Sequence, residues 1–304
     1  VAEALHEQQI ARIAAEIERR HHDRGLRLVF IAGPSSSGKT TFSKRLAIQL
    51  LAHGLRPFTL ELDNFFVDRE LTPRDETGNF DFEALETINL PLFNDSLLRL
   101  TQGEQVLLPR FDFIHGKSTK GLLAQLSENQ IIIIEGIHGL NPDLVTSVPA
   151  DSIYRIYASA LTQLNVDAHN RVPTTDVRLL RRITRDAVQR GYSATDTIIR
   201  WPSVRRGEKR YIFPYQENAD VMFNSTLVYE LAALRPLAEP LLLQVEPATP
   251  AHIEANRLLS FLRWVHPFTT AQLDRIPDTS LLREFIGKSI LKDYHPGDGP
   301  HEQA

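Results

Sequence analysis

The amino-acid sequence predicts an α/β protein in which helices cover both faces of a parallel sheet. Apolar runs of strand length alternate with segments of helical periodicity. A glycine-rich loop joins the first of these runs to a helix, and acidic residues follow two later runs. Strands that alternate with helices run parallel through right-handed crossovers, and ligands gather at the carboxyl ends of such strands. We therefore expect a ligand site where the loop and the acids meet.

The first strand and its loop carry the most specific motif. Residues 26–32 are an apolar run, and residues 33–40 fit G-x-x-x-x-G-K-[ST], the phosphate-binding P-loop. A helix follows, with Phe42, Leu46 and Leu50 at helical spacing. A Ser/Gly turn that merely opens a helix is the alternative, but strand, loop and helix together are the context that the motif requires. The fold class is therefore that of the P-loop NTPases.

Each residue type in the loop suits phosphate chemistry. Gly33 and Gly38 let the backbone bend so that N–H groups converge on an anion, and the helix N-terminus adds partial positive charge. Lys39 supplies a mobile cation for the β- and γ-phosphates, and the Thr40 hydroxyl can bind Mg²⁺. The predicted cofactors are ATP and Mg²⁺. The predicted nucleotide-binding residues are Gly33, Ser35, Ser36, Ser37, Gly38, Lys39, Thr40 and Thr41, together with Arg185 further along the chain.

The other elements follow from periodicity and turn residues. In chain order we expect a helix over 3–22 that Gly25 ends, a strand over 57–62, a loop over 68–82, a helix over 85–100, a strand over 130–134, a basic helix over 176–191, a last strand over 241–245, a helix over 252–265 and a disordered tail over 293–304.

Two carboxylates end predicted strands at the edge from which the P-loop emerges. Asp63 precedes Phe65 and Phe66, whose rings can exclude water from an acceptor site, so it can take the proton of an attacking hydroxyl or bind Mg²⁺. Glu135 can hold Mg²⁺ directly or through water, or it can be a solvated acid at a strand end. Gly136 stands where a hydrolytic ATPase usually has a second acid, which favours transfer to something other than water.

A basic stripe marks the predicted helix over 176–191. Arg178, Arg182 and Arg185 share one helix face, with Arg181 beside them. Guanidinium groups match phosphate oxygens, so we interpret the stripe as a lid that closes over triphosphate. An exposed basic face or a contact with RNA are the alternatives.

Three further polar residues lie within apolar surroundings. Asp81, Asp112 and His115 can bind a hydroxylated substrate, or they can be turn and capping residues. The predicted substrate-binding set consists of these three residues with Asp63, Phe66 and Phe111. His138 forms an E-x-x-H pair with Glu135, but a metal pair of that kind needs a helix, so we interpret His138 as structural.

Composition excludes several classes of function. The 304 residues are 42% hydrophobic and 24% charged, which is ordinary for a globular protein. The net charge of -4, from 34 basic and 38 acidic residues, argues against a chain that mainly binds nucleic acid. No apolar run reaches membrane-spanning length, and the absence of cysteine fits a cytoplasmic address. The oligomeric state stays open, a homo-oligomer included.

The sequence resembles a known family over roughly residues 26–245. The stretches "GPSSSGKTTF", "LELDNFFVDRE", "NFDFEALE", "LPRFDFIHGK", "IIIIEGIHGL" and "RLLRRITRDAVQRG" resemble the uridine kinase and phosphoribulokinase branch of P-loop kinases in order and spacing. The stretches "TPRDETGNFDFEAL", "EGIHGLNPDL" and "IPDTSLLREFIGKS" are similar to bacterial uridine-kinase-like nucleoside kinases, and they extend the match to about residue 292. In that subgroup the kinase follows a region similar to threonyl-tRNA synthetase.

The resemblance implies roles for matching positions. Asp63 matches the base that accepts the proton of the attacking hydroxyl, and Glu135 matches the acid near Mg²⁺. Asp81 matches an Asp that binds ribose hydroxyls, while Arg178 and Arg182 match lid arginines.

One segment departs from the family pattern. Uridine kinases carry Tyr where this chain has Phe111, and a His more distant than His115. The hydrogen bond of the phenol is lost, which affects recognition of the base and not phosphoryl transfer.

The resemblance also divides the chain. It implies a helix over 1–25 that can link to a further N-terminal domain, a kinase domain over 26–245, and a C-terminal helical extension over 246–292. The implied activity is transfer of the γ-phosphoryl group of ATP to the 5′-hydroxyl of a nucleoside, with uridine or cytidine first. A kinase for another small alcohol, such as pantothenate or a sugar phosphate, and a nucleotide-gated module associated with RNA are the alternatives.

Overall fold

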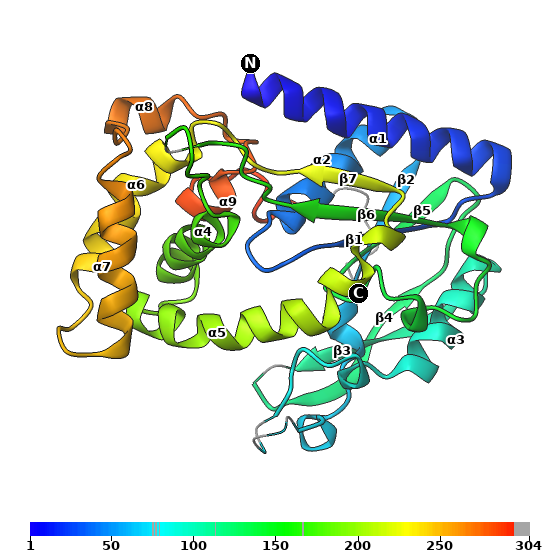
Figure 1. Ribbon diagram of the computed structural model, residues 1–304. Coiled ribbons are helices and arrows are strands. Elements are labelled where there is room, and N and C mark those ends of the chain that lie inside the picture. Colours follow the sequence, from blue (N-terminus) through cyan, green and yellow to red (C-terminus); the bar gives the residue numbers. More distant parts are fainter. Residues whose placement is uncertain (75, 77, 79, 113, 166, 295–304) are drawn as a thin grey trace.

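A parallel five-stranded sheet forms the centre of the molecule, in the order β2-β5-β1-β6-β7 (Figure 1). The computed structural model describes residues 1–294 except 75, 77, 79, 113 and 166. The strands are β1 (Leu28–Ala32), β2 (Arg56–Glu61), β5 (Gln130–Glu135), β6 (Ile153–Ser159) and β7 (Val221–Asn224). All paired neighbours run parallel. The predicted fold class is confirmed.

The two faces of the sheet bury alternate residues of each strand. In β1, Val29 and Ile31 belong to a core shared with α1 (Ala2–Arg24) and α2 (Lys39–Ala52). Leu28 and Phe30 face a second core, which includes side chains of α3 (Leu90–Thr101) and of the antiparallel hairpin β3–β4 (Val106–Asp112 and Lys117–Ala124). Figure 1 shows these two layers above and below the sheet. Burial of all five residues of β1 fixes the strand that leads into the P-loop.

A helical layer beside the sheet completes the fold, at the left of Figure 1. It consists of α4 (Thr174–Gln189), α5 (Ala194–Tyr211), α6 (Glu230–Leu243), α7 (Pro250–Leu262), α8 (Thr270–Asp274) and α9 (Arg283–Ile286). α4 packs against α5, α6 and α9, so the basic helix is an internal element of this layer.

One predicted element is wrong, and another begins later than predicted. Residues 241–245 are no strand, because α6 continues to Leu243; Pro236 and Pro240 inside it disguise the helical pattern. The last strand is β7, which is only four residues long and half-exposed. The helix expected over 85–100 begins at Leu90, after the 3-10 turn Leu85–Thr87, because the side chain of Asn89 accepts a hydrogen bond from the Leu92 N–H and caps it.

The N-terminal helix ends as predicted. Gly25 has φ 68 and closes the last turn of α1 through N–H bonds to the His21 carbonyl. The tail predicted to be disordered lies outside the described residues from position 295 onward. No helix in the described part of the chain is long and apolar enough to cross a membrane.

Candidate active site

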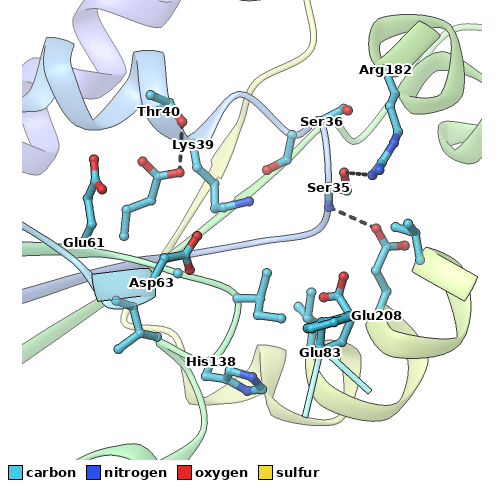
Figure 2. Close-up of a pocket in the computed structure, with 18 of the residues that line it drawn as sticks. Ser35, Ser36, Lys39, Thr40, Glu61, Asp63, Glu83, His138, Arg182 and Glu208 are labelled. Atoms are coloured by element: carbon cyan, nitrogen blue, oxygen red, sulfur yellow. Dashed lines mark hydrogen bonds between the residues drawn. The ribbon is translucent and has the colours of Figure 1, made fainter. Parts of the chain in front are cut away.

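A cavity of about 490 Å³ opens at the carboxyl ends of β1, β2 and β5, between the P-loop and α5 (Figure 2). The register places Glu61 and Glu135 opposite each other on β2 and β5, so both carboxylates reach this edge. The cavity therefore lies where ligands bind in open α/β sheets.

The backbone of the P-loop has the shape of an anion nest. Ser36 and Gly38 have left-handed φ angles of 58 and 85, which turn successive N–H groups to one side. At Gly33 an added Cβ would lie 1.9 Å from the Ala158 carbonyl oxygen. Only glycine therefore allows the loop to pass β6 this closely.

Lys39 points into the cavity from the start of α2 (Figure 2). Its Nζ donates to the carbonyl oxygens of Gly33 at 3.0 Å and Pro34 at 3.3 Å. Burial lowers the pKa of Lys39, while the carboxylates of Glu135 and Glu284 oppose this effect. Lys39 is thus a cation that the loop itself holds beside the acids of the cavity.

Thr40 and Glu135 form a pair of oxygen donors. The Thr40 hydroxyl donates to Glu135 Oε1 at 3.0 Å. Burial raises the pKa of Glu135 to about 7, and the Lys39 ammonium opposes the shift. Mg²⁺ at phosphates usually takes one or two protein oxygens and completes its shell with water and phosphate. The pair fits that use, and the described residues form no group of three or more acids and histidines that could hold a metal ion.

Asp63 lies in the 3-10 turn Leu62–Phe65 that follows β2, and its carboxylate lines the cavity near Lys39 (Figure 2). Water reaches Asp63 within the cavity, but the surrounding protein weakens its solvation and raises its pKa. The charge of Glu61 adds to this rise, and Lys39 opposes it. A carboxylate with a raised pKa is a stronger base than an ordinary aspartate.

A comparison with known proteins decides the family. The model of the Phosphoribulokinase / Uridine kinase family matches residues 28–232. The chain belongs to this family. The match includes the P-loop, both strand-end acids and the basic helix, whereas α1 and the segment after residue 232 lie outside it.

Members of this family among the curated proteins are distant relatives. The chain is 27% identical over 205 residues to uridine kinase of Saccharomyces cerevisiae, with 65% of this chain and 36% of the yeast protein covered. It is 26% identical over 195 residues to uridine kinase of Halobacterium salinarum, with 63% and 77% covered. The chain thus spans about a third of the yeast relative's length. Among solved structures, a possible uridine kinase from Bacillus stearothermophilus aligns with a TM-score of 0.42 at 20% identity, with 66% of this chain and 89% of that chain covered.

The arginines of the family's basic helix divide into two groups. Arg178 is 1% exposed and forms a buried ion pair with Glu208, and its Nε donates to the Ser35 carbonyl oxygen at 2.9 Å. Arg181 is fully buried against Glu230 and donates to the Ser36 carbonyl oxygen at 3.3 Å.

The position of Arg178 does not support the catalytic role expected for it, which stays a prediction. Its guanidinium binds the Ser35 carbonyl oxygen of the P-loop and the Glu208 carboxylate of α5, and it is not among the described residues that line the cavity.

Arg182 and Arg185 are the arginines of this helix that line the cavity. Arg182 donates to the Ser35 hydroxyl at 2.7 Å, as Figure 2 shows, and Arg185 donates to Asp186 at 2.9 Å. The helix expected to act as a lid is packed on the phosphate loop through these contacts.

The two groups of arginines predict opposite results of mutation. Arg178→Ala removes the buried ion-pair partner of Glu208, which keeps only the Ser35 N–H at 3.0 Å and the more distant Arg205 at 4.0 Å. We therefore expect a loss of about 3–5 kcal/mol of stability and a clear fall in Tm. Arg182→Ala should keep the Tm within a few degrees and lower kcat about 10²–10³-fold, as the loss of one donor to a charged transition state does. Thermal melting and steady-state kinetics on both variants test this. A variant of Arg178 that keeps its Tm and loses its rate would contradict the assignment.

The residues expected to bind the acceptor are only partly brought together. Phe66 lines the cavity, and its ring meets that of Phe111 edge-on at 5.6 Å, behind the lining. Asp81 accepts a hydrogen bond from the Tyr211 hydroxyl at 2.7 Å and is not among the described residues that line the cavity. Asp112 and His115 lie at the turn of the β3–β4 hairpin, outside the cavity.

Hydrogen bonds within the hairpin turn engage Asp112 and His115, whose expected role in substrate binding stays a prediction. Asp112 Oδ1 accepts the N–H groups of Ile114 and His115 at 2.9 and 3.1 Å, and Oδ2 contacts the His115 ring at 2.6 Å. These hydrogen bonds to His115 lower the pKa of Asp112. In this structure the pair closes a turn, and no contact directs it toward a substrate.

Four carboxylates in the lining were not singled out from the sequence: Glu61, Glu83, Glu208 and Glu284. Glu61, Glu83 and Glu284 lie within stretches that carry the family resemblance, but their residue types alone do not assign them a role, and Glu208 lies in none of these stretches. Glu61 is the one with a signal, since it ends a strand at the edge where the P-loop emerges. His138 also lines the cavity, and burial lowers its pKa to about 4, so its ring is neutral at neutral pH.

Proposed function

We propose that this chain is an ATP-dependent nucleoside kinase that transfers the γ-phosphoryl group to the 5′-hydroxyl, with uridine and cytidine as the first candidates. The observation that carries the proposal is the position of Asp63, whose raised pKa and place beside the Lys39 ammonium suit a base next to a phosphate site. Membership in the Phosphoribulokinase / Uridine kinase family supports phosphotransferase chemistry.

The charges of the cavity favour an uncharged acceptor. Away from the P-loop the lining presents Glu61, Asp63, Glu83 and neutral His138, together with apolar groups such as Phe66. Burial and the nearby Glu208 charge raise the pKa of Glu83. Among the described lining residues, the cationic side chains come from the P-loop, which provides Lys39, and from α4 and the residue that follows it, which provide Arg182, Arg185 and Arg190. A nucleoside with neutral hydroxyl groups fits such walls better than the carboxylate of pantothenate or the phosphate of a sugar phosphate.

The residues divide the work of transfer. The loop N–H groups and Lys39 hold the β- and γ-phosphates in place. Thr40 and Glu135 would hold a Mg²⁺ ion, which would supply neutralisation of charge on the phosphate oxygens. Asp63 orients the acceptor hydroxyl and takes its proton as the oxygen bonds to the γ-phosphorus. The bond from that phosphorus to the bridging oxygen breaks, ADP leaves, and Arg182 stabilises the charge that develops. Gly136 stands where a hydrolytic ATPase usually has a second acid, which favours transfer to an alcohol over hydrolysis.

An acceptor panel tests the substrate class. Uridine, cytidine, purine nucleosides, pantothenate and sugar phosphates are each assayed for ADP release with Mg-ATP. We expect turnover with neutral nucleosides and none with the anionic alcohols. If only an anionic alcohol is turned over, that alcohol is the substrate and the proposed nucleoside specificity is wrong. Salt-dependent retention of RNA with no turnover at all would favour an RNA-associated module.

A further inference from the structure

A C-terminal segment beyond the family match, residues 276–292, is part of the phosphate site. Its side chains Leu281, Leu282 and Phe285 have no exposed surface. Arg283 is 3% exposed and donates to the carbonyl oxygens of Leu273 at 3.2 Å and Pro277 at 3.4 Å. The segment is therefore fixed in the core and is not a loose tail.

This segment lies directly on the P-loop and its helix. An added Cβ on Gly38 would lie 2.2 Å from Leu281 Cδ2, so the leucine fills the space above that glycine. Lys44 of α2 donates to the carbonyl oxygens of Leu291 and Lys292, each at 2.6 Å. Both contacts hold the segment at the start of α2, where the nucleotide phosphates are expected.

From this position the Glu284 carboxylate accepts two hydrogen bonds from groups that can also bind phosphate. Its Oε2 accepts from the Thr41 backbone N–H at 3.3 Å and from the Thr41 hydroxyl at 3.0 Å. The Thr41 N–H lies in the first turn of α2, where N–H groups have no partner within the helix and bind anions readily. Glu284 also lines the cavity that contains Lys39.

We infer that Glu284 is an internal competitor of the nucleotide, whose carboxylate occupies hydrogen bonds of Thr41 that a phosphate group of the bound nucleotide takes over. The inference rests on the proposed function, because it requires a nucleotide at the P-loop. Since the backbone around Glu284 is fixed, displacement needs only a rotation of its side chain. The C-terminal segment thereby sets nucleotide affinity from outside the family domain.

Glu284→Ala and Glu284→Gln test the inference through binding of Mg-ADP, measured by titration calorimetry on the full chain. Both variants should bind about 10-fold more tightly or better than wild type, because a charge-assisted hydrogen bond no longer has to be broken and a negative charge is gone. Asp278→Asn is the control. It removes the same charge from the same segment at a side chain that is 61% exposed and 3.7 Å from Arg283, and its affinity should stay at the wild-type value.

The outcomes separate the two proposals. If wild type binds Mg-ADP and both Glu284 variants bind it equally well or more weakly, the inference is overturned while the proposed function stands. Glu284 then positions Thr41 and does not compete with the nucleotide. Equal tightening in Asp278→Asn also overturns it, because the effect would then come from net charge. A wild-type chain that binds neither Mg-ADP nor Mg-ATP overturns the proposed function as well.

Discussion

Replacing Lys39 by alanine is expected to abolish detectable phosphoryl transfer and to weaken ATP binding. Lys39 is the lysine of the P-loop, and its Nζ lies within hydrogen-bond reach of the Gly33 and Pro34 carbonyl oxygens at the floor of the cavity. Without it, the charge of the β- and γ-phosphates is left to backbone N–H groups and the arginines of the basic helix. Nucleotide titration and a coupled ADP assay measure both effects.

The Lys39 variant should fold normally, which separates loss of function from loss of structure. Burial lowers the pKa of this lysine, so the protein environment opposes its charge, and alanine should not lower the Tm. Lys209→Ala, which removes an exposed lysine of α5, serves as the control for net charge. Turnover at the wild-type rate in Lys39→Ala would reject the phosphate-site assignment.

Asp63→Asn should leave ATP binding close to normal while kcat falls about 10²–10⁴-fold, the usual value of a general base. Asparagine keeps the shape of the side chain but is a very poor base. Because burial and the Glu61 charge raise the pKa of Asp63, the wild-type enzyme should lose kcat/KM on the acid side above the ordinary range of an aspartate. Steady-state kinetics over a pH series measures both effects.

A control variant and a magnesium titration test the role of Asp63. Glu61→Gln removes a neighbouring carboxylate from the same lining and should move the acid limb of the pH profile to lower pH, without the large fall in kcat. If Asp63 binds Mg²⁺ instead, Asp63→Asn will bind Mg-ATP poorly and excess Mg²⁺ will restore part of the rate. An Asp63→Asn enzyme with the wild-type rate would contradict both roles.

The sheet edge that carries the phosphate loop could be predicted from the sequence, because its signals are local. The glycine pattern of residues 33–40 lies between an apolar strand and an amphipathic helix, and Glu135 follows four isoleucines. Parallel pairing then brings Glu135 beside the strand of the P-loop. Propensity and the chirality of crossovers are sufficient for this part of the fold.

The surroundings of the loop could not be predicted, because they depend on contacts between distant segments. Arg178 and Arg182 lie on the same face of the helix by their spacing. Arg178 is nevertheless buried in an ion pair with Glu208 of α5, whereas Arg182 lines the cavity. Glu208 lies in no stretch that carries the family resemblance. Glu284 lies in one, but the local sequence does not show that its carboxylate reaches Thr41. Asp112 and His115 close the hairpin turn, and a turn uses the same residue types as a binding site, so the sequence alone does not separate these two roles.

The most direct measurement of the central claim follows the label of γ-labelled ATP in the presence of uridine or cytidine. The proposed function predicts that the label moves to the nucleoside as a 5′-monophosphate, with little inorganic phosphate, and that Asp63→Asn suppresses this product. Label recovered only as inorganic phosphate, or only on an alcohol other than a nucleoside, would contradict it.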